Sequence, residues 1–146
     1  MKVSQFLNTN QPRIITCRRA DTLQAAASLL YTNRIGAMPV VDSTGKLVGI
    51  LSERDIVSAI SQRASELMKL RVRDIMASPP VTCSEDADMQ DAMQLMMSHK
   101  FRHLPIVNGD KLVGMLSIRD CLAMELRDKE LEANVLRDRV IATRFS

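Results

Sequence analysis

Apolar residues recur at helical spacing in two segments of the chain, residues 23–31 and 89–97. In each segment they stand at i, i+3, i+4, i+7 and i+8, which places them on one face of an α-helix. The pattern predicts two helices with this face in the core. In the second segment the face is rich in methionine, which fills irregular gaps between packed elements, so this stripe is predicted to be core and not a cofactor site. The positions are Leu23, Ala26, Ala27, Leu30 and Tyr31, and then Met89, Ala92, Met93, Met96 and Met97.

Two pairs of apolar strands follow these predicted helices. The segments MPVV and KLVGIL are separated by the turn sequence DSTG, and LPIV and KLVGML by NGD. Asn-Gly between apolar runs is a strong hairpin signal. A short β-branched stretch precedes each first helix, and a second helix is expected to begin near Ser52 and near Ser117. Each half of the chain therefore follows the order β-α-β-β-α.

The two halves form an internal repeat. A shift of 66 aligns residues 15–42 with 81–108, and a shift of 65 aligns KLVGILSERD (46–55) with KLVGMLSIRD (111–120). Eight of the ten positions in these decapeptides are identical. The one-residue gap falls at the hairpin tip, where a change of length costs least. A half of about 65 residues would be marginally stable alone, so we expect one integrated unit.

The predicted fold class is α/β (α+β), with two tandem repeats related by a pseudo-two-fold axis and a long C-terminal helix. We assign residues 1–70 to repeat one with its connector, 71–126 to repeat two and 127–146 to a helical tail. No glycine or proline follows Asp120, which predicts one helix over about 118–143. The tail either caps its own domain or contacts a second copy, and both interpretations stay open. Its apolar stripe is Leu122, Leu126, Ala133, Leu136 and Val140.

Composition and charge narrow the function classes. Apolar residues make up 46% and charged residues 25%, as in an ordinary globular protein. With a net charge of +3, no tryptophan and no Lys/Arg tract, the chain lacks the features of a nucleic-acid-binding surface. No apolar run approaches the ~18 residues that span a bilayer, and the amino terminus lacks the apolar core of a signal peptide. We expect a cytoplasmic protein with no nucleic-acid partner and no membrane contact.

Catalytic and metal chemistry find little support in the sequence. Cys17, Cys83 and Cys121 show no metal-ligand spacing and are predicted to be buried packing residues. The two histidines, His99 and His103, have no metal spacing either. No nucleophile elbow, Walker loop or GxGxxG motif occurs. We therefore predict no enzyme activity, no catalytic residues and no metal site.

The junction after each hairpin, LSERD and LSIRD, carries the candidate chemistry. Ser52 and Ser117 stand where helix N-caps are expected, with Asp55 and Asp120 at the third helical position. In one interpretation these residues only cap the helices. In the other, the helix terminus and its hydroxyl receive a phosphate, while the carboxylate accepts two ribose hydroxyls. A strand glycine three residues before each serine supports the second interpretation, because it admits close approach to the backbone.

These motifs together resemble the cystathionine-β-synthase (CBS) domain pair, or Bateman module. The family pattern is a proline strand, hPhh, followed after the hairpin turn by G-h-h-S-x-x-D-h. Here MPVV stands with GILSERDI, and LPIV with GMLSIRDC, and the match covers about residues 3–126. The resemblance implies two CBS repeats without catalysis that bind AMP, ADP, ATP, NAD or S-adenosylmethionine in two clefts. It also implies assembly into a flat homodimeric disc.

Carried over by position, the resemblance implies a set of nucleotide-binding residues. Asp55 and Asp120 would hold ribose hydroxyls, and Ser52 and Ser117 would face phosphate. The stretches just before the prolines would lie against the base or the phosphates, and an arginine before each aspartate would add charge. The further candidates are Thr16, Thr82, Ala37, Met38, Arg102, His103, Leu104, Arg54 and Arg119.

The two repeats differ just before the proline strand. Repeat one has Gly36-Ala37 where repeat two has Arg102-His103. Basic residues at this point often reach the phosphate chain in family members. The cleft that carries Asp120 is therefore predicted to bind charged nucleotides better. The alternative, that His103 is an ordinary surface or strand-edge histidine, stays open.

The predicted function is an adenine-nucleotide-binding regulatory or sensor module that acts on a separate, unidentified partner protein. The expected ligand is AMP, with ATP, ADP and NAD as further candidates, and no catalytic cofactor is expected. The alternative is a ligand-independent protein-interaction module whose nucleotide clefts are vestigial.

Overall fold

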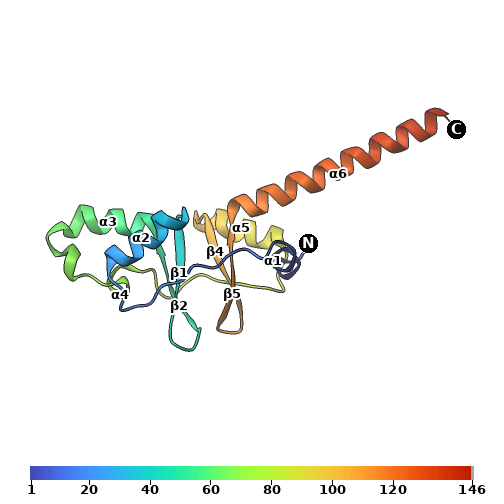
Figure 1. Ribbon diagram of the computed structural model, residues 1–146. Helices are drawn as coiled ribbons and strands as arrows, with labels where there is room; N and C mark the ends of the chain where they lie inside the picture. The colour runs from blue at the N-terminus through green and yellow to red at the C-terminus, as the bar shows by residue number, and fades with distance from the viewer. Residues whose placement is uncertain (146) are drawn as a thin grey trace.

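The computed structural model describes residues 1–145, with side chains described up to Ile141, and confirms the mixed α/β class and the long C-terminal helix. Two small sheets form the body, and α6 extends away from it (Figure 1). The elements are α1 (Val3–Asn10), α2 (Leu23–Asn33), β1 (Ala37–Val41), β2 (Leu47–Ser52), α3 (Glu53–Arg63), the 3₁₀ helix η1 (Ala64–Lys69), α4 (Val72–Ile75), β3 (Cys83–Ser84), α5 (Met89–His99), β4 (His103–Asn108), β5 (Lys111–Ser117) and α6 (Ile118–Phe145).

The two sheets have matching registers. In repeat one β1 pairs antiparallel with β2, and Ala37 lies opposite Ser52. In repeat two β4 pairs antiparallel with β5, and His103 lies opposite Ser117. In each pair the register shifts directly after the residue that follows the proline, between Val40 and Val41 in β1 and between Ile106 and Val107 in β4. The strand predicted to open each repeat is β3 in repeat two, but in repeat one it is reduced to a bridge between Cys17 and Val40.

The helix faces read from the sequence are partly buried and partly exposed. Leu23, Ala26 and Leu30 of α2 are buried, as are Met89, Ala92 and Met96 of α5. Tyr31 and Met97, which occupy equivalent positions at the ends of these stripes, are 87% and 63% exposed. The prediction that the whole stripe lies in the core is wrong at these two residues, because position i+8 is rotated by about 80° from position i around the helix axis and so lies at the edge of the stripe.

Each repeat core is completed by a segment that precedes the other repeat. The amide of Val3 in α1 donates to the carbonyl of Ala87 at 2.8 Å, and Val3 and Phe6 lie in the core of repeat two. The amide of Val72 in α4 donates to the carbonyl of Asp21 at 3.0 Å, and Val72 lies in the core of repeat one. The repeats are therefore linked by an exchange of lead-in helices as well as by their shared surface.

This exchange accounts for the strand glycines. A methyl group on Gly49 would lie 2.6 Å from Sδ of Met76 and 3.0 Å from the carbonyl oxygen of Ala77. A methyl group on Gly114 would lie 2.8 Å from both δ-carbons of Leu7. The neighbours that require glycine are therefore the lead-in segments. The sequence-based argument that a ligand requires these glycines is wrong.

Replacing Gly49 with alanine should lower the free energy of unfolding by about 1–3 kcal/mol, the usual cost of overpacking. Gly114→Ala should cost less, because the Leu7 side chain can change rotamer whereas the Ala77 carbonyl is fixed in the backbone. Urea denaturation followed by far-ultraviolet circular dichroism measures both. An equal loss in the two variants would contradict this packing.

The three cysteines lie in the interior of the protein. Cys17, Cys83 and Cys121 are all buried free thiols, as predicted. Burial raises the pKa of Cys17 to about 12. Burial also raises the pKa of Cys121 to about 11, with a smaller contribution from the nearby Asp120 carboxylate. Both thiols therefore stay protonated at neutral pH.

Among residues 1–145, no helix combines the length and the apolarity needed to cross a membrane.

Candidate functional site

The Ser52–Asp55 junction joins β2 to α3 through a reciprocal cap. Ser52 Oγ accepts a hydrogen bond from the Asp55 amide at 3.2 Å, and the Ser52 amide donates to Asp55 Oδ2 at 2.9 Å. The Ser52 hydroxyl also lies 3.0 Å from Asp55 Oδ2. This is the capping box in which glutamate usually takes the third position. The shorter aspartate fulfils the same role here.

The Ser117–Asp120 junction repeats this geometry between β5 and α6. The Ser117 amide donates to Asp120 Oδ2 at 2.9 Å, and the Asp120 amide donates to Ser117 Oγ at 3.1 Å. The capping interpretation is therefore confirmed in both repeats. In both aspartates, Oδ1 makes no hydrogen bond to another described residue. The caps thus leave one carboxylate oxygen in each repeat able to accept hydroxyl groups.

The helix termini are less open to phosphate than the sequence suggested. The first amide of α3, on Glu53, donates to the Gly36 carbonyl at 2.9 Å, and the first amide of α6, on Ile118, donates to the Arg102 carbonyl at 2.9 Å. The third amide of each helix is taken by the cap serine. An anion at either terminus would therefore rely on side chains more than on backbone amides.

The remaining candidates fall into exposed and buried groups. Thr16 and Thr82 are exposed and lie beside the proline strands, because the next residue of each bridges to β1 or β4. Arg54 and Arg119 are exposed in the first turns of α3 and α6. Ala37, Met38 and Leu104 are buried, Met38 and Leu104 completely. A ligand could contact these three only through their backbone.

Charged groups from both repeats meet around His103. A methyl group on Gly36 would lie 3.4 Å from His103 Cε1 and 3.9 Å from Glu53 Oε2, so the two repeats touch here. Burial lowers the pKa of His103 below its ordinary value, the nearby Asp120 and Glu53 carboxylates oppose this, and Arg102 adds to it. We call Glu53, Arg102, His103 and Asp120 the His103 cluster.

The His103 cluster makes the two junctions chemically unequal. It gathers the predicted Arg102, His103 and Asp120, whereas the equivalent pre-proline stretch of repeat one is Gly36-Ala37. Glu53 was not predicted, because its electrostatic interaction with His103 crosses between the repeats. The available signal was the difference between SERD and SIRD, where repeat two has the uncharged Ile118 in place of Glu53.

Comparisons with known proteins agree on one family. The sequence model of the CBS domain matches residues 3–62 and 72–126. CBS domain-containing protein YhcV of Bacillus subtilis is 31% identical over 127 residues, which cover 87% of this chain and 89% of that protein.

Solved structures give the same result. CBS domain protein PAE2072 from Pyrobaculum aerophilum, complexed with AMP, is 30% identical with a TM-score of 0.72, over 82% of this chain and 89% of that one. The CBS domain pair of protein MJ0100, in complex with 5′-methylthioadenosine and S-adenosyl-L-methionine, is 26% identical with a TM-score of 0.75, over 88% of this chain and 98% of that one. The duplicated motif, the fold and these matches together show that the chain belongs to the CBS domain family, as a CBS domain pair.

Proposed function

We propose that this CBS pair is an adenine-nucleotide-binding regulatory module, with AMP as the favoured ligand, that acts on a partner protein in trans. The observation that carries the proposal is the duplicated serine–aspartate cap, in which one oxygen of Asp55 and of Asp120 has no hydrogen bond to a described residue. Two vicinal ribose hydroxyls are suitable donors to such a carboxylate, and charge-assisted bonds of this kind are strong. AMP in the related PAE2072 complex supports an adenosine ligand.

The two clefts should differ in affinity. A phosphate near repeat two would meet the Arg102 guanidinium and the His103 imidazole, whereas repeat one offers Gly36-Ala37 at the same position. The Ser52 hydroxyl donates a hydrogen bond to Asp55 Oδ2, whereas the Ser117 hydroxyl makes no such bond to Asp120, which leaves its proton for a phosphate oxygen. Glu53 opposes an anion, so we infer that the Asp120 cleft favours a monophosphate over longer phosphate chains.

Thermal unfolding with added nucleotide tests this proposal. A ligand at about 100 times its dissociation constant stabilises the native state by about 2.7 kcal/mol. For a domain of this size the melting temperature should rise by roughly 5–11 °C. AMP, ADP, ATP, NAD and S-adenosylmethionine form the panel, with GMP as the control for the base. No shift with any of the adenosine ligands would sink the proposal.

The contribution of His103 to AMP affinity should rise as the pH falls from 7.5 to 6. The pKa of His103 lies below its ordinary value of 6.5, mainly through burial, so the free imidazole is neutral at pH 7.5. A bound phosphate favours the imidazolium, so binding takes up a proton and is stronger at lower pH. Without ligand the sign reverses: the unfolded chain binds the proton more tightly, so His103 reduces stability as the pH falls through its unfolded pKa.

Isothermal titration of AMP at pH 7.5 and pH 6 measures this coupling. Because the AMP phosphate also titrates in this range, the useful quantity is the difference between the wild-type protein and His103→Gln. From pH 7.5 to pH 6, the ratio of the wild-type affinity for AMP to that of the variant should increase. Identical pH dependence in the two proteins would remove His103 from the site.

A ligand-independent interaction module is the second candidate. The observation that favours it is the length of α6 beyond the body, whose exposed apolar side chains include Leu131 and Val135. This candidate predicts no thermal shift with nucleotides and loss of partner binding when the tail after Arg127 is removed. The flat homodimeric disc stays a prediction under both candidates.

A further inference from the structure

Four arginines gather at the end of repeat one that carries α4 (Figure 1). They come from the segment before α2 and from the start of α4, and backbone contacts join these two segments. The Arg73 amide donates to the Arg19 carbonyl at 3.0 Å, and the backbones of Thr22 and Arg71 form a bridge. We call the four residues the arginine end; they are Arg18, Arg19, Arg71 and Arg73.

The fold makes little use of these guanidinium groups. Arg18, Arg19 and Arg73 are exposed, and none of the four arginines forms an ion pair with a described residue. The Arg71 side chain donates a hydrogen bond to the Ala20 carbonyl at 3.4 Å, and the other three side chains make none to a described residue. Three guanidinium groups are therefore available to another molecule.

Repeat two builds the same backbone arrangement without arginine. There the Ser4 amide of α1 donates to the Glu85 carbonyl at 2.9 Å, and residues 2 and 88 form the bridge that residues 71 and 22 form in repeat one. In the order of the arginines, the matching positions hold Ser84, Glu85, Lys2 and Ser4. Because the arrangement forms with these residues as well, the fold does not require the arginine end.

The two ends of the domain pair carry opposite charge. The helices α4 and α1 lie at opposite ends of the body (Figure 1). Over residues 18–22 and 71–74 the net charge is +2, from four arginines and two aspartates. Over the matching residues 84–88 and 2–5 it is −2, from one lysine, one glutamate and two aspartates.

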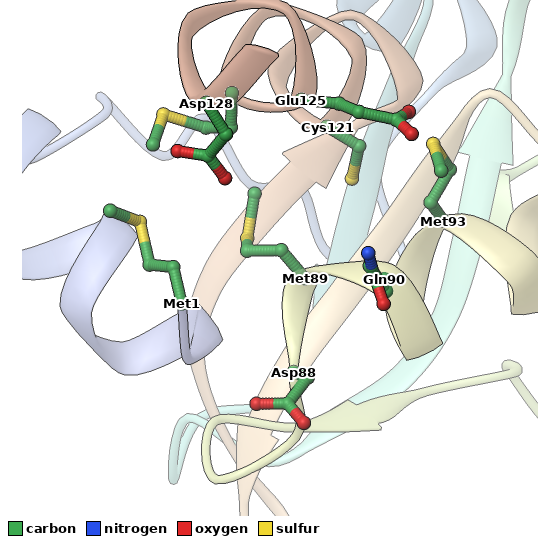
Figure 2. Close-up of a pocket in the computed structure, with 9 residues that line it drawn as sticks. Met1, Asp88, Met89, Gln90, Met93, Cys121, Glu125 and Asp128 are labelled. Carbon is green, nitrogen blue, oxygen red and sulfur yellow. The ribbon is translucent and has the colours of Figure 1, made fainter. Parts of the chain in front are cut away.

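The acidic character of the repeat-two end extends onto α6. Asp88, at the start of α5, lines a pocket of about 260 Å³ together with Glu125 and Asp128 of α6 (Figure 2). Like charges placed opposite each other disfavour association, and opposite charges favour it. An acidic segment would therefore be repelled from this end and attracted to the arginine end.

The chemistry of the arginine end fits a protein segment that carries several carboxylates. Guanidinium groups bind carboxylates through two parallel hydrogen bonds. Asp21 and Asp74 lie among the arginines, with their carboxylates held by backbone amides. A nucleic acid is charged at every nucleotide and would meet these carboxylates, and residues 18–22 and 71–74 contain no aromatic ring to stack on a base. A peptide can place neutral residues opposite the two aspartates.

We propose that the arginine end binds an acidic segment of the partner protein that this module regulates, with carboxylates of the partner paired to Arg19 and Arg73. This surface depends on the proposed function only for the existence of a partner in trans. None of the four arginines is a candidate nucleotide residue. Because Arg18 follows the candidate Thr16 by two positions, the variants below leave it unchanged.

Fluorescence anisotropy with a labelled peptide of alternating glutamate and serine tests the pairing at low ionic strength, where charge attraction is screened least. The wild-type chain should bind this peptide saturably and should not bind a peptide with glutamine in place of glutamate. Arg19→Gln combined with Arg73→Gln should raise the dissociation constant about 10-fold, because each exposed ion pair contributes modestly. AMP affinity and melting temperature should keep their wild-type values, since both side chains are exposed.

Arg127→Gln combined with Arg137→Gln is the matched control, because it removes the same charge from exposed arginines of α6. It should leave the affinity for the glutamate peptide unchanged, and an equal loss in this control would overturn the proposal by reducing the interaction to general charge attraction. A wild-type chain that does not bind the glutamate peptide, or that binds single-stranded DNA more tightly through Arg19 and Arg73, would also overturn it. Binding of the peptide by a chain that binds no adenine nucleotide would support this surface and contradict only the nucleotide ligand.

Discussion

Replacing Asp55 and Asp120 together with alanine should weaken AMP binding by about 10- to 100-fold in each cleft. Each substitution removes a carboxylate oxygen that accepts ribose hydroxyls in the proposed complex, and hydrogen bonds to a charged group contribute roughly 1.5–3 kcal/mol. Asp55→Ala and Asp120→Ala alone should each affect one cleft, and Asp120→Ala should have the larger effect on the tighter site. Isothermal titration calorimetry with AMP measures affinity and stoichiometry for all three variants.

Loss of the helix cap must be separated from loss of the binding group. Asp74→Ala is the matched control, because Asp74 Oδ2 accepts a hydrogen bond from the Arg71 amide at 2.7 Å in the same capping arrangement at the start of α4. This variant should lose about 1 kcal/mol of stability, the usual value of a cap, and keep the wild-type affinity for AMP. If the Asp55 and Asp120 variants bind AMP as tightly as Asp74→Ala does, their carboxylates do not hold the ribose.

Phe6→Ala should lower the free energy of unfolding by about 3–5 kcal/mol, the usual cost of truncating a buried aromatic ring. Phe6 is 6% exposed and lies in the core of repeat two, although it precedes repeat one in the sequence. The expected fall in melting temperature is roughly 6–20 °C. Differential scanning calorimetry of the full chain provides the measurement.

Phe101→Ala controls for the loss of a ring. Phe101 is 42% exposed and stacks on His99 with ring centroids 5.3 Å apart, so its truncation should cost less than about 1.5 kcal/mol. If Phe6→Ala costs no more than Phe101→Ala, then α1 does not complete the core of repeat two. That outcome would also contradict the mutual dependence of the repeats.

Local sequence patterns predicted the elements of this fold well. The Asn-Gly turn, the serine caps and the apolar spacing of α2 and α5 act over a few residues, so each could be recognised locally, and the second copy of the serine cap and of the apolar spacing supported the first. The long α6 followed from the absence of glycine and proline after Asp120. The exchange of α1 and α4 between the repeats was not predicted, because it depends on which core each short helix reaches in three dimensions.

In the candidate site too, the local features were predicted from the sequence and the contacts between the repeats were not. The serine–aspartate caps were predicted from their spacing and occur in both repeats. The strand glycines were assigned to a ligand, but Met76, Ala77 and Leu7 are their neighbours. The approach of Glu53 to His103 was missed, because it joins residues that are fifty positions apart in sequence. Contacts between repeats are set by tertiary packing, and no local pattern records them.

Titration of ligand-free protein with AMP tests the central claim most directly. We expect saturable binding with two clefts of unequal affinity, and loss of the tighter class of sites in Asp120→Ala. Protein stripped of any co-purified nucleotide, and checked by its absorbance at 260 nm, is the starting material. No heat of binding and no protection from thermal unfolding at millimolar AMP, in protein with native circular dichroism, would contradict the account.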